Sequence, residues 1–347
     1  MDRMYVQDCC EILDSLRVPI TAGDREGGEY PYYGANGIQD YVADYIFDDE
    51  LVLLAEDGGN FGSREKPIAY RVSGKCWVNN HAHVLKPKAG LDVDYLCYSL
   101  MFYKVDGMVN GATRQKLTQS AMRKMEIPLR SMEEQVHIID ELNRIVKIKK
   151  QRQLELQLLD DLIKARFVEM FGDPILNPKG YKKEPAESHI DLLSGYPFKS
   201  EQYVDEGVNI CGGLIIMPQN IKWEECMHWN STEGYEDYLL NENDIVIALD
   251  RPWISNGFKI AKVDAEHLPA LLIQRTARVR AIDMNQEYLY YCFINGRFES
   301  HSNVTGSLVP HISAKDIRSF EVMLPPMELQ NQFADFVHQV DKSKVVA

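Results

Sequence analysis

Several features typical of membrane, secreted and zinc-binding proteins are absent from this chain of 347 residues. No apolar run reaches the ~18 residues that a membrane span requires. The chain starts MDRMYVQDCC and lacks the basic and then apolar layout of a signal peptide. The seven cysteines are odd in number and form no C-x-x-C pair, which argues against a disulfide framework or a structural zinc site. We therefore expect a cytoplasmic protein with reduced thiols and no membrane contact.

The signatures of nucleotide-binding and DNA-modifying enzymes are absent as well. Residues 23–28 have the glycines of a phosphate-binding loop, but Glu29 stands where a lysine is required. We find no G-x-G-x-x-G loop, no Asp/Glu-x-Lys triplet of a metal-dependent nuclease, and no Asn/Asp-Pro-Pro-aromatic loop of an amino-methyltransferase. His81 and His83 alternate along one strand, but without a third ligand nearby they favour a structural role. We expect no catalytic residue, metal or cofactor in this chain itself.

Basic residues are scarce, because 38 lysines and arginines face 52 aspartates and glutamates, which gives a net charge of −14. Phosphate binding depends on lysine and arginine, so this balance argues against DNA binding through overall charge. Screening limits each charge to about 8 Å at physiological salt, so a local basic groove can still hold phosphates. The composition predicts weak DNA binding by the isolated chain and partners that supply basic surface.

The strongest pattern that is present is an internal repeat with a long spacing. Gly111–Gln135 and Gly306–Gln330 are identical at seven of 25 positions, where chance predicts roughly one or two. The apolar stretches that follow Glu50 and Asp244 also resemble each other. A spacing of this length indicates duplication of a whole domain together with its connector.

A long helix is predicted between the two copies. No proline or glycine occurs from Ser131 to Phe171, and Gly172 and Pro174 then stop the helix. Ser131 and Glu134 match a capping box at its start. The helix would span about 60 Å, too long for burial in one small domain, so its apolar seam should bind another helix. The seam positions expected to contact a partner are Leu142, Val146, Leu156, Ile163 and Phe167.

These features predict an α+β fold with two similar domains separated by the long connector helix, and a shorter C-terminal helix packed antiparallel to it. The expected segments are residues 1–130 and 175–325 for the domains, 131–174 for the connector helix, and 326–347 for the short C-terminal helix. The strand candidates are Leu51–Ala55, Ala69–Val72, Ala82–Leu85, Ile245–Leu249, Phe258–Val263 and Ala277–Ala281.

Polar loops that contain glycine recur at matching points of the two copies. Glycines let backbone N–H groups approach phosphates, and asparagine and arginine can bond base edges bidentately. A surface hairpin with ordinary charges is the alternative for the loop after Asp57. The candidate DNA-contacting residues are Asn60, Ser63, Arg64, Lys66, Arg114, Gln115, Lys116, Arg251, Trp253, Ser255, Asn256, Arg275, Arg278 and His311.

Several stretches resemble the specificity subunits of type I restriction–modification systems. They are Glu11-ILDSLRVPITAGDREGGEYPYYGANGIQDYV, Leu51-VLLAEDGGNFG, Gly111-ATRQKLTQSAMRKMEIPL and the helix end Phe171-GDP. The resemblance covers nearly the whole chain and includes the order of domain, helix, domain and helix. It implies two target-recognition domains held apart by antiparallel helices, each reading one half of a split sequence in double-stranded DNA.

The resemblance also implies partners. Two methyltransferase subunits would bind the helices and methylate adenine with S-adenosylmethionine, and a motor–nuclease subunit would join with ATP and magnesium. One departure is that only 21 residues follow Pro326, so the second helix is shorter than the first and partner binding through it would be reduced. Two alternatives remain. They are the recognition subunit of a fused methyltransferase–nuclease system (type IIB or IIG) and a helical scaffold whose two β-rich modules do not bind DNA.

Overall fold

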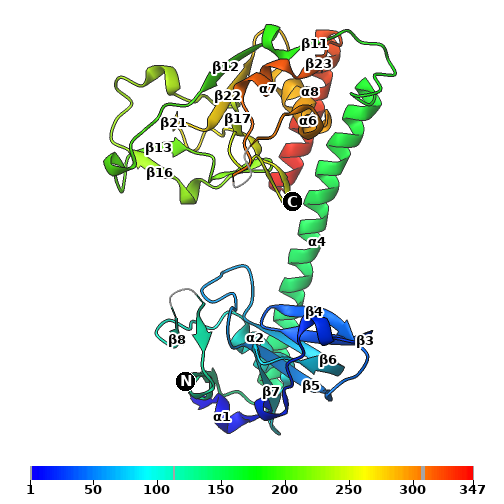
Figure 1. Cartoon of the computed structure of the whole chain (residues 1–347), viewed down its shortest axis with the longest axis vertical. Coiled ribbons are helices and arrows are strands. Elements are labelled where there is room, and N and C mark those ends of the chain that lie inside the picture. The colour runs from blue at the N-terminus through cyan, green and yellow to red at the C-terminus, as the bar shows by residue number, and fades with distance from the viewer. Residues whose placement is uncertain (1, 112–113, 306–308, 347) are drawn as a thin grey trace. The chain divides into compact units, whose positions relative to one another are not determined.

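The chain divides into two units, residues 1–151 (unit 1) and residues 152–347 (unit 2). Figure 1 shows the computed structural model, which describes residues 2–111, 114–305 and 309–346. Gly306, the repeat partner of Gly111, lies outside the described residues.

One long helix, α4 (Met132–Phe171), contributes to both units because the division falls in its middle. It begins with the predicted capping box: the Ser131 backbone N–H donates to Glu134 Oε2 at 2.8 Å, and the Glu134 N–H donates to Ser131 Oγ at 3.3 Å. It ends at Gly172, whose φ of 84° is a conformation that glycine adopts without strain. The predicted helix is confirmed, although the sequence analysis set residues 131–174 apart as a segment of its own.

Unit 1 is built on one six-stranded sheet in the order β2-β7-β5-β6-β3-β4, in which only β3 and β6 are parallel neighbours. The strands of this sheet are β2 (Cys10–Ile12), β3 (Gly27–Gly34), β4 (Gly37–Val42), β5 (Phe47–Ala55), β6 (Ala69–Val78) and β7 (Ala82–Pro87). The other elements are α1 (Val6–Cys9), α2 (Val93–Met101), α3 (Gln119–Arg123), the pair β1 (Arg3–Tyr5) and β10 (Glu126–Pro128), and the pair β8 (Val109–Asn110) and β9 (Lys116–Leu117).

The central strand β5 explains how this sheet is held. Leu51–Ala55 are completely buried, and successive side chains point to opposite faces. Val52 and Leu54 belong to a core that includes residues of α2 and α3, whereas Leu51 and Leu53 belong to a second core on the other face. Because both faces are covered, the loop that leaves β5 starts from a fixed point.

Unit 2 contains a four-stranded antiparallel sheet, β12-β22-β17-β20, and a separate three-stranded sheet, β16-β13-β21. These strands are β12 (Ile190–Ser194), β13 (Val208–Cys211), β16 (Met227–Trp229), β17 (Ile245–Ala248), β20 (Ile260–Lys262), β21 (Ala270–Leu272) and β22 (Thr276–Ala281). The two-stranded pairs are β11 (Lys183–Pro185) with β23 (Glu321–Met323), β14 (Ile216–Met217) with β15 (Asn220–Ile221), and β18 (Trp253–Ile254) with β19 (Gly257–Phe258). The helices are α5 (Gln286–Asn295), α6 (Phe298–His301), α7 (Ala314–Ser319) and α8 (Met327–Val346).

The strand order shows the duplication. The strands β2-β7-β5-β6 of unit 1 correspond to β12-β22-β17-β20 of unit 2, and all neighbours in both sets are antiparallel. The strand that contains Leu51 is therefore equivalent to the strand that begins at Ile245, as the sequence repeat predicts. Outside this shared part the units differ, because unit 1 extends its sheet with the hairpin β3–β4 and unit 2 adds the three-stranded sheet.

A buried glutamine fixes the long helix of each copy to its own unit. Gln135 Oε1 accepts the Asp92 N–H at 2.8 Å, and Gln330 Oε1 accepts the Asn285 N–H at 2.9 Å. Asp92 and Asn285 are the N-caps of α2 and α5. The amide nitrogens of both glutamines donate to backbone carbonyls, so each side chain uses both ends. The glutamine that is identical in both copies of the sequence thus has the same structural task in each.

In unit 2 the second half of α4 packs antiparallel against α8, as predicted. Arg152 donates to the Lys344 carbonyl at 2.9 Å, and further along α4 the rings of Phe167 and Phe333 meet edge to face with centroids 5.5 Å apart. Among the described residues no helix is both long enough and apolar enough to cross a bilayer.

We expect Gln330→Ala to lower the free energy of unfolding of unit 2 by about 2–4 kcal/mol, because it leaves the Asn285 N–H and the Pro325 carbonyl without partners. Gln339→Ala, at an exposed position of the same helix, is the control and should change it by less than about 0.5 kcal/mol. Urea unfolding of the full chain measures the change, and hydrogen exchange locates it. Equal losses in the two variants would show that the buried amide does not anchor α8.

Candidate nucleic-acid interface

In unit 1 the glycine-rich loop after β5 lies beside the loop before α3. The Gly58 N–H donates to the carbonyl of Gln115, an exposed residue, at 3.1 Å, and Asp57 forms an isolated bridge with Lys116. The turn between β3 and β4 joins them, because the Asn36 side-chain amide donates to the Gly58 carbonyl at 2.9 Å. Three loops from distant parts of the sequence therefore form one polar surface at the end of β5. The sequence analysis missed Asn36, although residues 34–37, with two glycines and an asparagine, are typical of a turn.

Two of the four candidates in the glycine-rich loop are free to contact a ligand. The side chains of Arg64 and Lys66 are exposed and have no hydrogen-bond or ion-pair partner among the described residues. Ser63 Oγ accepts the backbone N–H of Lys66 at 2.9 Å, which shapes the turn. The Asn60 amide donates to the Pro67 carbonyl at 3.4 Å. Ser63 and Asn60 thus hold a loop that presents two cations.

The basic candidates of the second loop pair with acidic residues at the end of β5. An Nη of Arg114 donates to Asp57 Oδ1 at 3.1 Å, and His81 Nδ1 lies 2.5 Å from the same oxygen. Lys116 Nζ lies 3.0 Å from Glu56 Oε1. The Arg114 side chain is 59% exposed, so its remaining N–H groups stay open to a ligand.

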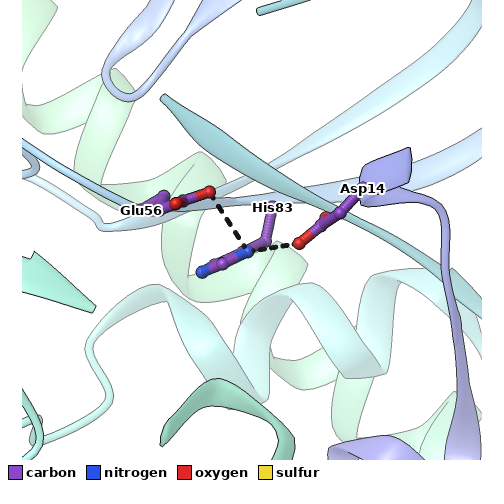
Figure 2. A group of neighbouring side chains, drawn as sticks. All are labelled: Asp14, Glu56 and His83. Atoms are coloured by element: carbon purple, nitrogen blue, oxygen red, sulfur yellow. Dashed lines mark hydrogen bonds and ion pairs between the residues drawn. The ribbon is translucent and has the colours of Figure 1, made fainter. Parts of the chain in front are cut away.

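Close to these loops lies a buried charged cluster of Asp14, Glu56 and His83, which Figure 2 shows with both carboxylates turned toward the imidazole ring. His83 Nδ1 lies 2.7 Å from Asp14 Oδ2 and 3.6 Å from Glu56 Oε2, while Nε2 lies 2.9 Å from the Leu117 carbonyl oxygen. Arg17 Nη1 donates to Glu56 Oε2 at 2.6 Å. The cluster thus ties the second loop, through Leu117, to the strand β7 and to the end of β5.

The same three side chains have the donor atoms of a metal site, but those atoms are already bonded. Arg17 and Lys116 contact the Glu56 carboxylate, and two N–H groups donate to Asp14 at 2.9 Å. A metal ion would displace these bonds and add positive charge beside two cations. The expectation that His83 has no third ligand nearby is wrong, because Asp14 and Glu56 come from distant parts of the chain. We nevertheless assign the cluster a structural role.

Unit 2 repeats the loop contact of unit 1 at the end of β17. Asp250 and His311 form the counterpart of the bridge in unit 1, and the Arg251 N–H donates to the Pro310 carbonyl at 2.7 Å. Arg275 Nη1 donates to Asp250 Oδ2 at 2.5 Å, although its side chain is 69% exposed. The same contact therefore places arginine side chains at the surface in both units.

A hollow of about 500 Å³ opens beside this contact in unit 2. Its lining includes Arg251, Arg275, Gln274, Leu214 and Lys259. Lys259 is only 6% exposed and donates to the Gly213 carbonyl, and burial together with the charge of Arg251 lowers the pKa of its ammonium group. Leu214 is 83% exposed. The sequence analysis missed Leu214, Gln274 and Lys259. The adjacent Gly212 and Gly213, which are typical of a turn, are a sequence signal that could have pointed to this place.

The remaining candidates of unit 2 differ in access. Ser255 and Asn256 are exposed at the tip of the hairpin β18–β19. Trp253 stacks on Phe258 with ring centroids 5.1 Å apart, so one face of its ring is used in packing. His311 is exposed, and its Nε2 lies 2.7 Å from a threonine hydroxyl.

The assignment of Arg278 to DNA contact is wrong. Arg278 is 6% exposed, and its guanidinium donates to Asp191 Oδ2 at 2.5 Å. It lies on β22, which is flanked by β12 and β17 in the sheet. Alternation along a strand indicates which side chains share a face, but it does not show whether that face is buried.

The candidate partner-binding residues of α4 fall into two groups. Ile163 and Phe167 are completely buried in the core of unit 2, in the cluster that also contains residues of α8, so the prediction is wrong for these two. Leu142 and Leu156 are half-buried, and Val146 is 39% exposed. Other apolar residues of α4 that are exposed are Met132, Val136, Ile145, Ile148, Leu154, Leu158, Leu162 and Val168.

The order of two similar domains, each followed by a helix, is shared with known proteins. A sequence model of the family described as type I restriction modification DNA specificity domain matches residues 2–158 and again residues 196–345. This chain belongs to that family. The double match corresponds to the duplication seen in the sequence and in the strand order.

Curated relatives in this family are specificity subunits. A putative type I restriction enzyme specificity subunit of Haemophilus influenzae is 34% identical over 143 residues, which are 41% of this chain and 37% of that protein. The EcoAI specificity subunit of Escherichia coli is 33% identical over 49% of this chain and 29% of that protein. The chain thus spans about a third of the length of these two relatives. The MjaVIII specificity subunit of Methanocaldococcus jannaschii is 22% identical over 97% of this chain and 85% of that protein.

A solved structure shares the fold of this family member. The crystal structure of the type I restriction–modification system S subunit from M. genitalium superposes with a TM-score of 0.54 at 13% identity. The superposition covers 99% of this chain and 90% of the other. The predicted α+β fold with two similar domains and connecting helices is therefore confirmed.

The charged cluster makes the stability of unit 1 depend on pH. Burial raises the pKa of the Asp14 carboxyl, but the hydrogen bond and charge of His83, with two further N–H donors, outweigh it and hold that pKa below its ordinary value. Burial likewise raises the pKa of Glu56, and Arg17 and Lys116 lower it further than burial raises it. A carboxyl whose pKa is lower in the folded state stabilises the fold above its unfolded pKa of about 4. This stabilisation is lost as the pH falls through the folded pKa.

We expect Asp14→Asn to lower the stability of unit 1 at pH 7 by about 3 kcal/mol or more, because it breaks a buried charge network. The variant should also depend less on pH than the wild type between about pH 5 and 2. Urea midpoints across this pH range measure both effects, with the exposed Asp8→Asn as the control. An Asp14→Asn curve that runs parallel to the wild-type curve would contradict the assignment.

Proposed function

We propose that each unit reads one half of a bipartite sequence in double-stranded DNA and that the chain directs partner subunits to this sequence. The observation that carries the proposal is the loop contact that occurs twice, at the ends of β5 and β17. Exposed arginines gather there in each unit, Arg64 and Arg114 in unit 1 and Arg251 and Arg275 in unit 2. Arginine is the side chain that most often contacts guanine specifically in the major groove. Membership in a DNA specificity family supports the proposal.

We assign the chemistry to partner subunits. Two methyltransferase subunits would use S-adenosylmethionine, and a motor–nuclease subunit would use ATP and magnesium, while this chain has no catalytic role. The names of the relatives, which are specificity subunits of restriction enzymes, support this division. The net charge of −14 is consistent with such partners, because a basic partner surface would strengthen the weak DNA binding that is expected of the isolated chain.

The helix α4 is the proposed contact for the methyltransferase subunits. Its apolar residues Ile148 and Leu154 are 63% and 60% exposed, and exposed apolar side chains on a long helix favour association with another helix. Of the positions that the sequence suggested, Leu142, Val146 and Leu156 stay available to a partner. Basic residues in the middle of α4, at positions 147, 149 and 150, are exposed beside them in the sequence.

The purified chain should neither methylate nor cut DNA by itself. The expectation follows from the missing sequence signatures and from the structural role of the buried histidine cluster. Incubation of the full chain with S-adenosylmethionine carrying a labelled methyl group and a mixture of duplex DNA measures methyl transfer. Adenine methylation above the level of a heat-denatured control would refute the division of labour.

Arg64→Ala should weaken recognition of only one half of the target, by about 1–3 kcal/mol if the arginine contacts a guanine. Selection of bound duplexes from a randomised pool, followed by sequencing, measures the base preference at each position. Arg3→Ala, which removes a half-exposed cation of unit 1 outside the three loops, is the control and should leave base preferences unchanged. A uniform loss of affinity over all sequences would instead identify Arg64 as a phosphate contact.

A further inference from the structure

One acidic residue occupies the same place in both units, two residues beyond the end of the buried central strand. The backbone of Asp57 forms an isolated antiparallel β-bridge with Lys116, and the backbone of Asp250 forms one with His311. In each unit the next residue then donates its N–H to the neighbouring loop and has a positive φ, which is 63° for Gly58 and 45° for Arg251. Asp57 and Asp250 are thus equivalent in backbone position as well as in chemical type.

Each of these aspartates holds an arginine, yet the arginines come from different places in the two copies. Arg114 reaches Asp57 from the loop before α3 at 3.1 Å. Arg275 reaches Asp250 from the turn between β21 and β22 at 2.5 Å. In the repeat alignment Val309 is the counterpart of Arg114, so the arginine is not matched in the sequence. The aspartate is what the two copies share.

The residue after each aspartate explains the different routes. A Cβ on Gly58 would lie 3.1 Å from Arg114 Nε, so the glycine leaves room for the arginine to lie over it. Unit 2 has Arg251 at this point. There the paired arginine is Arg275, which lines one hollow together with Arg251 and Asp250. Arg275 also adopts a positive φ of 62°, a conformation that costs a bulky residue about 1 kcal/mol or more and that commonly marks functional sites.

An acidic residue at this place works against phosphate binding, because it adds negative charge where DNA would lie. The ion pair itself adds little to folding, because the arginine of each pair is exposed and such pairs are worth about 0–1 kcal/mol. The pairing does restrict the arginine to one orientation. A guanidinium has five N–H groups, and a carboxylate on one side leaves the others directed outward. A restrained arginine loses less entropy when it binds a base edge.

We propose that Asp57 and Asp250 are positioning residues that hold Arg114 and Arg275 for contact with a guanine, one in each half of the target. The proposal rests on the proposed function and adds the base class and the two readers. The paired side chains are 20% exposed for Asp57 and 27% for Asp250, against 59% and 69% for their arginines. The carboxylates therefore lie behind the guanidinium groups, which are the outermost part of each pair.

The test uses the full chain at low ionic strength, where phosphate contacts are stronger, and a randomised pool of duplex DNA from which bound sequences are selected and sequenced. Arg114→Ala and Arg275→Ala should each reduce the preference for one guanine by about 5- to 150-fold, in different halves of the target. Asp57→Asn and Asp250→Asn should reduce the same preferences by about 3- to 10-fold. They should at the same time leave affinity for non-specific duplex equal or higher, because a negative charge is removed. Asp57→Glu and Asp250→Glu should restore part of the preference.

The matched control is Asp94→Asn, which breaks an aspartate–arginine pair of unit 1 at 2.9 Å outside the loops and should change no base preference. Thermal unfolding of every variant shows whether it is folded, and the glutamate variants keep the test informative if an asparagine variant is not. Guanine preferences that survive both asparagine substitutions but not the alanine substitutions would overturn the positioning role. Loss of preference in both halves from one substitution would overturn it too. A wild-type chain that selects no sequence at all would instead refute the proposed function, and the inference with it.

Discussion

In both units the central strand is buried on both faces, and the position of the loop that leaves it depends on that burial. Leu51–Ala55 of β5 and Ile245–Ala248 of β17 are fully covered by apolar side chains. A strand fixed in this way can place its next residue with little freedom. The residues that follow the strand include Asp57 in unit 1 and Asp250 in unit 2. In both units the neighbouring loop is hydrogen-bonded to this segment.

Outside the shared strands, different kinds of interaction hold the loops of the two units in place. Unit 1 uses a buried network of charges, in which His83 lies between two carboxylates and a backbone carbonyl. The part of unit 2 that follows β17 instead relies on turns with positive φ angles and on the buried ammonium group of Lys259. A duplicated domain can diverge in this way because the loops lie outside the sheet, where replacement of side chains does not disturb the common core. Such divergence is what two domains with different targets require.

In the long helix α4, the apolar pattern in the sequence does not show which apolar residues are buried within the chain and which are exposed. The apolar seam of the helix predicted that Ile163 and Phe167 would contact a partner. Both are instead buried in a core that also contains residues of α8, where the rings of Phe167 and Phe333 meet. The exposed apolar residues Ile148 and Leu154 lie outside the predicted seam. An apolar pattern on a helix thus identified a surface that needs covering, whereas the fold determined which part was already covered.

The sequence by itself determined the duplication, the long helix with its cap and stop, the two buried central strands, and the family. These depend on local patterns: an apolar run, a Ser-x-x-Glu start, a glycine stop, and identical residues at a fixed spacing. It also placed polar loops at the correct strand ends, and Arg64, Arg114, Arg251 and Arg275 are exposed there. Only the tertiary structure decided that Arg278 is buried against Asp191, that Asn36 joins the loops of unit 1, and that Asp14 and Glu56 flank His83. The physical reason is that burial and charge pairing arise between residues tens of positions apart, and no pattern along the chain records which distant side chain will lie opposite.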